Sequence, residues 1–442
     1  YDARRKLREL EGQKDLFTNF KKEDIITLVN NNIKQIDYPN DNSVYLLKDV
    51  QQVVYRENGA SEDRNEVLIK ILNQDGINDW KEVSIPFNSY TQRLIIDKAE
   101  LFKKDGSKVQ AEINNNQIVF SSLEVGDVLH LNYQLESSSY GKLAEHFWED
   151  FNFNGGYPTK IARYSLIVPK EKNFQYKMYN TDVQPAISDV DDYKMYIWNK
   201  TNIPSVNAEV NMPPFSDIAE RIVVTSIPDW NYVANWYSDL SSIKAKGDFE
   251  VKEKAKELFN GKQNLTDLQK AKVIYEYIEN NFNYSAVPFL HSALTPQRAS
   301  RTITARLGDC KDLSTLFVAL AKEVGLDANL ILVDTRDNGD TNLDLPTIGF
   351  NHCIAQLNIE NKNYIIELTD NHLPFGALNY HDLNANGLSI PKEGEIATNA
   401  RLVKLNSPNR SSNFVDRVSK IIFTNNNIEI ERISKKIGAE AS

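Results

Sequence analysis

The chain has 442 residues, 41% hydrophobic and 25% charged, which predicts a globular protein of two or three domains. Its formal net charge of −10, with no stripe of Lys and Arg, argues against a nucleic-acid partner.

The cysteine content and the apolar runs exclude further classes. Two cysteines, Cys310 and Cys353, are too few for a disulfide framework or a four-cysteine zinc site. No apolar stretch approaches 18 residues, so we expect a chain that does not span a membrane. The first residue is Tyr1 and no signal-peptide pattern follows, which indicates a processed or trimmed chain.

The first half of the chain changes from a helical to a strand pattern. Residues 1–40 are predicted to form a helical arm, because apolar side chains recur at helical intervals. Residues 41–226 are predicted to form an antiparallel β-sandwich, because short apolar runs alternate with turn signals, among them Asp-Gly at 75–76 and 105–106. The predicted strands are 67–72, 94–102, 117–120, 128–135, 163–168, 193–198 and 222–226.

A mixed domain is predicted over residues 227–380. Helices are expected from Trp230, over 248–259, and from a capping box of Thr266 and Gln269 to about 282. Residues 381–442 form a C-terminal segment with little periodicity, in which 418–423 and 428–433 are predicted strands that would suit the start of a further β domain.

Cys310 is predicted to open a helix within Gly-Asp-Cys-Lys-Asp, residues 308–312. Asp309 is a good N-cap, and the apolar residues that follow share one face up to Gly325. A helix N-terminus favours the reactive thiolate, and its N–H groups can hold an oxyanion. A single cysteine in this position would otherwise be interpreted as a buried structural thiol.

His352 and Asp370 are predicted to lie on two paired strands. A three-residue loop at 360–362 would pair Ile359 with Asn363 and put His352 across from Asp370 on the same face. A two-residue loop would put the two side chains on opposite faces. With Cys310 as nucleophile, His352 as base and Asp370 as its orienting group, the order matches the thiol acyl-transfer enzymes.

Residues 265–375 resemble the transglutaminase-like domain of the papain-type superfamily, through 272–278, 308–312, Asn351-His352 and 367–370. The resemblance implies that Cys310, His352 and Asp370 are catalytic. The Gly-Asp-Cys-Lys-Asp form is typical of a bacterial branch in which a sandwich of the DUF3857 type precedes the catalytic domain. The implied fold is therefore an α+β multidomain chain, and the implied location is periplasmic or secreted.

Two functions remain open on these residues. The first is thiol-dependent acyl transfer on amide or peptide substrates, as a cysteine peptidase, an amidase or a transglutaminase, with no cofactor and no metal. The alternative is a non-catalytic binding or scaffold protein with a vestigial catalytic domain. The expected partner is a protein or peptide substrate, with a polymer as a further ligand of the β-sandwich.

Several other polar residues receive a weaker interpretation. Gln297 is a candidate oxyanion donor, and Cys353 is interpreted as core because strand alternation turns it away from His352. His291 and His372 are predicted to be surface residues. A solvated loop is favoured over a calcium site for four aspartates, Asp334, Asp337, Asp340 and Asp344.

Overall fold

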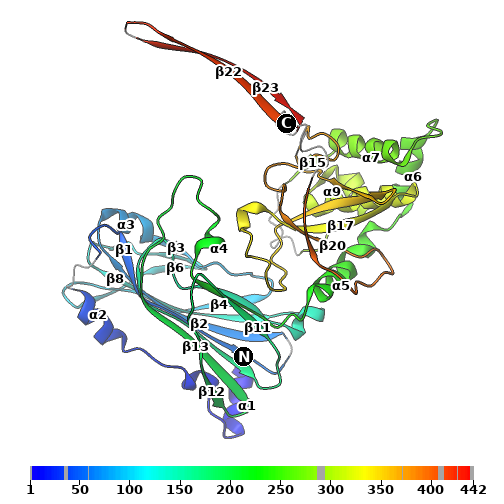
Figure 1. The fold of residues 1–442 in the computed structure, drawn as a ribbon. Helices are drawn as coiled ribbons and strands as arrows, with labels where there is room; N and C mark the ends of the chain where they lie inside the picture. The colour runs from blue at the N-terminus through cyan, green and yellow to red at the C-terminus, as the bar shows by residue number, and fades with distance from the viewer. Residues whose placement is uncertain are drawn as a thin grey trace. The chain divides into compact units, whose positions relative to one another are not determined.

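The computed structural model describes residues 2–33, 38–57, 59–285, 294–370, 372–406, 413–425 and 427–438. The chain divides into two compact units, Tyr1–Ile227 and Pro228–Ser442 (Figure 1). Among the described helices, none has the length and apolar character needed to cross a membrane.

The first unit is built on an eight-stranded sheet with the order β12-β13-β10-β1-β2-β8-β4-β5. Every pair in it is antiparallel except β1 with β10, so the predicted β-rich first part is confirmed with one parallel pair. The strands are β1 (Ser43–Val54), β2 (Ala60–Ile71), β4 (Gln92–Phe102), β5 (Lys108–Gln110), β8 (Val128–Ser138), β10 (Thr159–Pro169), β12 (Ala186–Val190) and β13 (Tyr193–Ile203).

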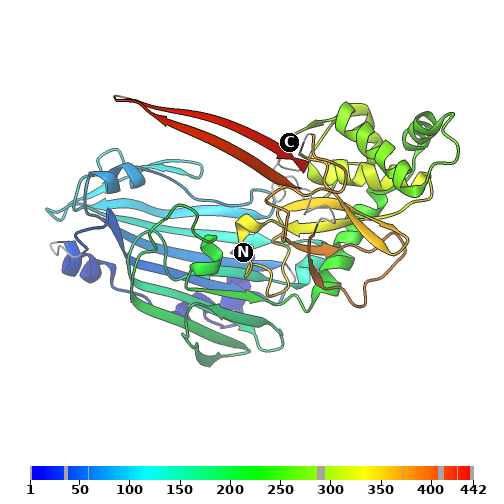
Figure 2. The same ribbon diagram turned by 45° about the horizontal axis from the view of Figure 1, so that its top comes forward.

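Two small sheets cover one face of this large sheet (Figures 1 and 2). One has the order β11-β14-β9, and its Phe151 stacks on Tyr164 of the large sheet with ring centroids 5.6 Å apart. The other has the order β3-β7-β6. The strands are β3 (Glu82–Ser84), β6 (Glu112–Asn114), β7 (Gln117–Val119), β9 (Trp148–Asn152), β11 (Gln175–Tyr179) and β14 (Arg221–Thr225).

The N-terminal helices cover the opposite face. Leu16 and Phe17 of η1 (Leu16–Asn19) pack on Val53 and Ile167, and Val29 of α2 (Ile25–Ile33) packs on a second cluster. The remaining helices of this unit are α1 (Asp2–Leu10), α3 (Gln74–Trp80), η2 (Gly141–Glu145) and α4 (Phe215–Ile218). The turn predicted at 75–76 is wrong, because Asn73 caps α3 there.

Two carboxyl groups lie inside the sandwich of the first unit. Asp63 of β2 and Glu149 of β9 are coupled through their charges. Burial, with the charge of Glu62, raises the pKa of Asp63 to about 7. Burial, with the charge of Asp63, raises the pKa of Glu149 to about 8. The other titratable groups that interact with this pair are Glu62, Tyr133, Asp150 and Tyr164.

These raised pKa values predict that stability falls as pH rises. Between the ordinary carboxyl pKa of about 4 and the folded pKa values of about 7 and about 8, the folded chain holds more protons than the unfolded chain. At about 1.4 kcal/mol for each unit of pKa shift, each group contributes up to about 4 kcal/mol, so we expect the unfolding free energy to fall by several kcal/mol between pH 4 and pH 8. Asp63→Asn with Glu149→Gln should flatten the profile, measured by denaturant unfolding at several pH values. The control Glu112→Gln, on exposed β6, should keep the parent slope, and parallel profiles for all three chains would contradict the prediction.

The second unit packs helices against a five-stranded sheet with the order β19-β18-β17-β20-β21. Strands β20 and β21 come from the segment after residue 380, where the sequence has little periodicity. The strands are β17 (Asp327–Asp334), β18 (His352–Ile359), β19 (Lys362–Ile366), β20 (Asn386–Ser389) and β21 (Leu402–Lys404), with a separate pair β15 (Asn283–Tyr284) and β16 (Leu307–Gly308). The helices are α5 (Trp230–Ser241), η3 (Ser242–Ala245), α6 (Phe249–Phe259), α7 (Asp267–Asn281), α8 (Ala299–Ala305), α9 (Cys310–Glu323) and η4 (Arg336–Asn338).

Helix starts in this unit follow the local sequence. Helix α5 begins at the predicted residue, Trp230, and Asp229 caps it. Thr266 with Gln269 forms the predicted capping box of α7, which is therefore confirmed. The C-terminal strands β22 (Phe414–Phe423) and β23 (Ile428–Ile437) also match prediction. In the described part of the chain these two pair only with each other, and their apolar side chains remain exposed.

Candidate active site

Cys310 is the first residue of α9, as the sequence predicts. Asp309 and Asp312 form a capping box, and Asp312 also accepts hydrogen bonds from the backbone N and the side-chain Nε2 of Gln297 at 2.7 and 2.8 Å. The amide of Gln297 therefore holds the start of the helix, and the oxyanion role considered for it stays a prediction. Cys310 is only 4% exposed, and this rigid setting fixes its sulfur at the positive end of the helix.

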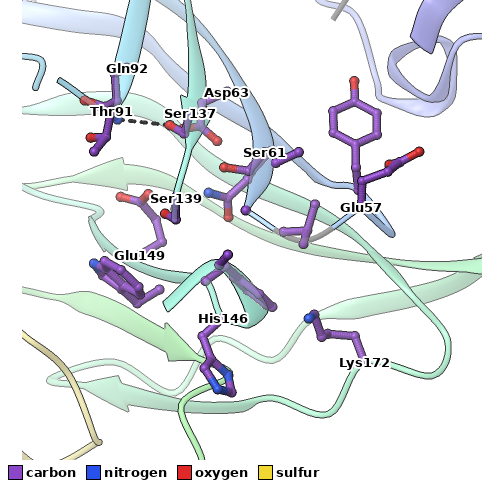
Figure 3. A pocket seen from close by; sticks show the side chains of 18 of the residues that line it. Glu57, Ser61, Asp63, Thr91, Gln92, Ser137, Ser139, His146, Glu149 and Lys172 are labelled. Atoms are coloured by element: carbon purple, nitrogen blue, oxygen red, sulfur yellow. Dashed lines mark hydrogen bonds between the residues drawn. The ribbon is translucent and has the colours of Figure 1, made fainter. Parts of the chain in front are cut away.

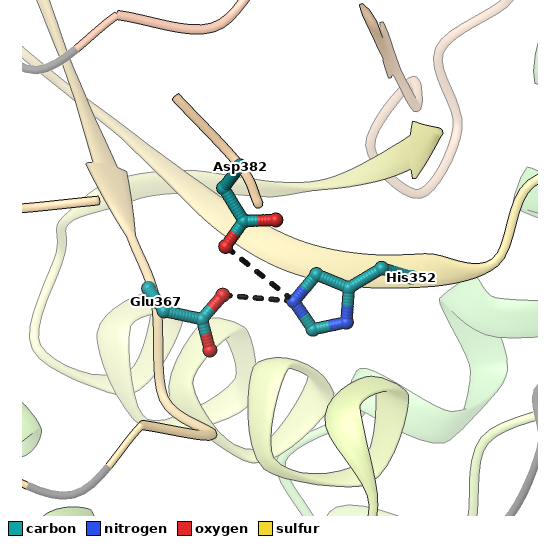
Figure 4. Close-up of side chains that lie close together, drawn as sticks. All are labelled: His352, Glu367 and Asp382. Carbon is teal, nitrogen blue, oxygen red and sulfur yellow. Dashed lines mark hydrogen bonds and ion pairs between the residues drawn. The ribbon is translucent and has the colours of Figure 1, made fainter. Parts of the chain in front are cut away.

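His352, the first residue of β18, lies between the cysteine and a carboxylate. Its Nε2 is 2.8 Å from Oε2 of Glu367 (Figure 4), and the ring also hydrogen-bonds the side chain of Cys310. Since Glu367 occupies Nε2, Nδ1 is left to face the sulfur. Helix α9 packs directly on β18, which brings the cysteine and the histidine together.

Glu367, and not Asp370, is the carboxylate that the structure pairs with His352. The predicted three-residue loop is wrong: Ile359 pairs with Lys362, so the loop has two residues, Glu360 and Asn361. Extending this register puts Glu367 on the face of His352 and turns Asp370 to the other face. Both loop residues have left-handed backbone, with φ of 50° and 63°, as in the tight turns that join twisted strands.

The charges of Glu367 and His352 stabilise each other. Burial alone would raise the pKa of Glu367, but the charge and hydrogen bond of His352, with hydrogen bonds from Asp382 and Thr369, lower it to about 2. Burial likewise opposes the charge of His352, yet Glu367 and Cys310 raise the pKa of its imidazole well above the usual value. The ring therefore carries its proton at neutral pH, and Nε2–H donates to Glu367.

Asp382, which sequence reasoning missed, completes a buried acidic pair beside the histidine. Its Oδ2 lies 3.9 Å from Nε2 of His352, and the residue is 1% exposed. Burial and the charge of Glu367 raise the pKa of Asp382 well above its usual range, so this carboxyl keeps its proton and donates it to Glu367. Asp382 follows β19 by sixteen residues in a segment without periodicity, so only the tertiary structure identifies it.

The same three side chains could hold a metal ion. Single ligand atoms of His352, Glu367 and Asp382 lie within 4.8 Å of one another. An ion there would have to displace the short contact between His352 and Glu367. The donor set of one imidazole and two carboxylates suits zinc or iron, so metal binding would compete with the hydrogen bond that orients the ring.

The other candidate residues lie outside this cluster. Asp370 is partly buried, and burial followed by the charge of Glu367 raises its pKa. Cys353 is fully buried and hydrogen-bonds Tyr237, in agreement with its interpretation as core, and both cysteines are free thiols. His372 is exposed, and His291 lies outside the described residues.

The solvated loop expected for the four aspartates is confirmed for Asp337, Asp340 and Asp344, which are exposed, but Asp334 ends β17 and is 1% exposed. Oδ1 of Asp334 accepts from Nδ2 of Asn338 at 2.7 Å, Asp337 pairs with His381 at 2.6 Å, and Asp340 pairs with Lys404 at 2.5 Å. Within the described residues, the group of side chains placed to hold a metal does not include them.

Comparison with family profiles identifies both parts of the chain. The profile of the transglutaminase-like superfamily matches residues 252–366, which include Cys310 and His352. Residues 252–366 are a transglutaminase-like domain. The profile of a domain of unknown function with a solved structure, DUF3857, matches residues 57–119 and 115–207. The predicted order of a DUF3857-type sandwich before a transglutaminase-like domain is therefore confirmed. Glu367 directly follows the last residue of the transglutaminase-like match.

One of the solved structures similar to this chain shares its two-part fold. A candidate protease from Parabacteroides distasonis ATCC 8503 has 16% sequence identity and a TM-score of 0.62, covering 90% of this chain and 95% of its own. A candidate cysteine protease from Cytophaga hutchinsonii has 14% identity and a TM-score of 0.25, covering 65% of this chain and 92% of its own. Among curated proteins, none is similar enough to match. At these identities the likeness to the first structure supports the two-part fold alone.

Proposed function

We propose that the transglutaminase-like domain catalyses thiol-dependent acyl transfer on amide or peptide substrates, with Cys310 as nucleophile and His352 as acid and base. The observation that carries the proposal is the unbroken sequence of contacts from Cys310 through His352 to Glu367. In thiol enzymes a nucleophile beside a base, with the base held by a third group, is the arrangement that activates sulfur. Asp370, the orienting group inferred from the sequence, is replaced in this proposal by Glu367.

The first half-reaction forms a thioester. The Cys310 thiolate attacks the carbonyl carbon of the amide, and the oxygen that becomes negative is held by N–H groups at the start of α9. Protonated His352 then gives its Nδ1 proton to the leaving nitrogen, the C–N bond breaks, and an amine departs. Glu367 stabilises the imidazolium before transfer, and Asp382 positions Glu367.

The second half-reaction releases the acyl group. Neutral His352 takes a proton from water or from an incoming primary amine, which attacks the thioester and breaks the C–S bond. Water gives a peptidase or amidase, and an amine gives a transglutaminase. Hydrolysis is favoured, because water needs no second binding site. Tyr284, which is 40% exposed and interacts electrostatically with Cys310 and His352, lies on the side from which we expect the substrate to enter.

The proposal is tested by following peptide substrates in the presence and absence of a fluorescent primary amine. Mass spectrometry of the chain mixed with a glutamine-containing peptide library should detect an acyl adduct on Cys310. Cleaved or deamidated peptides would identify a hydrolase, and amine-labelled peptides a transglutaminase. A chelator should leave the adduct unchanged. A chain that forms no adduct, and whose Cys310 resists small alkylating reagents at neutral pH, would instead be the non-catalytic binding protein.

A further inference from the structure

A cavity of about 260 Å³ lies in the first unit, at the ends of β1, β2 and β8 and beside β9 (Figure 3). Asp63 reaches it from the large sheet and Glu149 from the small sheet. The aromatic residues Tyr55, Phe147 and Trp148 also line it. Nothing in the proposed acyl transfer uses this cavity.

Asp63 and Glu149 occupy strand positions at which the alternation of side chains predicts apolar core residues. Asp63 shares the inner face of β2 with Ile69 and Ile71, and Glu149 shares the inner face of β9 with Phe151. Two acidic groups facing each other inside a sandwich are unfavourable for folding, because burial removes their hydration. This placement therefore indicates a ligand rather than a contribution to stability.

One oxygen of Asp63 has no hydrogen-bond partner. Asp63 is 7% exposed, and its Oδ1 is buried without a donor among the described residues. The carboxyl is hydrogen-bonded by Gln52, whose own Oε1 accepts from the hydroxyl of Tyr164 at 2.6 Å. Lys172, a cation that lines the same cavity, donates to the backbone carbonyl of Glu145. An acceptor on the cavity wall is thus left for a donor that enters from outside.

The residues that line the cavity indicate which kind of donor group it binds. Carboxylates accept charge-assisted hydrogen bonds from ammonium groups, and aromatic faces attract the same cation. The raised pKa values of Asp63 and Glu149 mean that the empty cavity is close to neutral, and that an entering cation would be matched by the release of a proton. The volume is below the range of about 300–1,000 Å³ that is typical of drug-sized ligands, so the occupant is small.

We propose that this cavity binds a primary ammonium group on an aliphatic chain, such as a lysine side chain or a small diamine, with Asp63 and Glu149 as its acceptors. The proposal assigns to the DUF3857 domain a class of ligand that is separate from the substrate of the second unit. It does not depend on acyl transfer by the second unit.

The test compares probes of one shape and different charge on the whole chain. Isothermal titration calorimetry at neutral pH should detect binding of pentylamine and 1,5-diaminopentane, and tenfold weaker or no binding of 1-pentanol. The comparison uses the unaltered protein, so no folding defect can imitate the result. Equal binding of pentylamine and 1-pentanol, or no binding of either amine, would overturn the proposal. So would binding of calcium ions with none of the amines.

Isosteric variants then test whether the amine binds in this cavity. Asp63→Asn and Glu149→Gln should each weaken pentylamine binding by about tenfold to a hundredfold, as expected for loss of a charge-assisted hydrogen bond. Glu112→Gln, a matched change on exposed β6 of the same unit, should leave the affinity unchanged. If all three variants bind pentylamine as the parent does, the amine binds elsewhere and the proposal is wrong.

Discussion

Cys310→Ala should abolish acyl transfer and covalent labelling, because no other group of the site can form the thioester. His352→Ala should lower turnover by at least about a thousandfold, since it removes both the base and the positive charge beside the sulfur. Residues that act as one unit lose activity non-additively, so the double variant should be hardly worse than either single one. The measurement is initial rate with the best peptide substrate, together with labelling by a thiol-reactive probe.

Cys353→Ala is the matched control for this experiment. It removes the other buried cysteine, which hydrogen-bonds Tyr237 and lies on the opposite face of β18 from His352. Labelling at Cys310 should persist in this variant, and circular dichroism should show that all variants remain folded. If Cys310→Ala unfolds the second unit while Cys353→Ala does not, Cys310 is a structural thiol and the binding-protein alternative is favoured.

Glu367→Gln should lower the reactivity of Cys310 at neutral pH by about tenfold or more. The amide keeps a hydrogen-bonding group beside Nε2 but removes the negative charge, which is the main cause that raises the pKa of His352. With a less basic ring, the imidazolium is lost at lower pH, so the sulfur lacks the neighbouring positive charge over more of the neutral range. The alkylation rate of Cys310 measured from pH 5 to pH 9 should therefore shift its rise toward higher pH.

Asp370→Asn tests the competing assignment in the same segment. The hairpin register, extended past Ile366, puts Asp370 on the opposite face of the sheet from His352. Removing the charge of Asp370 should therefore change the alkylation rate of Cys310 by less than about twofold at each pH. A profile that shifts in Asp370→Asn and not in Glu367→Gln would restore Asp370 as the orienting group. Asp382→Asn should give an intermediate shift, because it weakens the support of Glu367 without removing its charge.

Local sequence was enough to predict the start of the nucleophile helix. Asp309, Cys310 and Asp312 are consecutive or one turn apart, and the capping bonds between them depend only on short-range geometry. The same holds for the start of α5 at Trp230 and for the capping box of α7, which were also predicted correctly. The strand that carries His352 was predicted for a similar reason, because a short and mostly apolar run is also a local property of the sequence.

Which carboxylate pairs with His352 depends on whether the loop after Ile359 has two residues or three. Glu360 and Asn361 both adopt left-handed backbone, which shortens the loop to two residues and exchanges the faces of every later side chain. A signal was present in the sequence: Glu367 is the one charged residue in the apolar run 364–368, and a buried carboxylate needs a partner.

The sequence by itself determined the elements, the nucleophile with its helix, and the β-rich part that precedes them. Only the tertiary structure decided which carboxylates meet the histidine, and that Asp63 and Glu149 face one cavity. Asp382 reaches His352 from a segment with no periodic pattern, and Glu149 meets Asp63 across more than eighty residues of chain. The physical reason is that caps and alternation depend on neighbours in the chain, whereas contacts between sheets and loops depend on register and packing that no short segment contains.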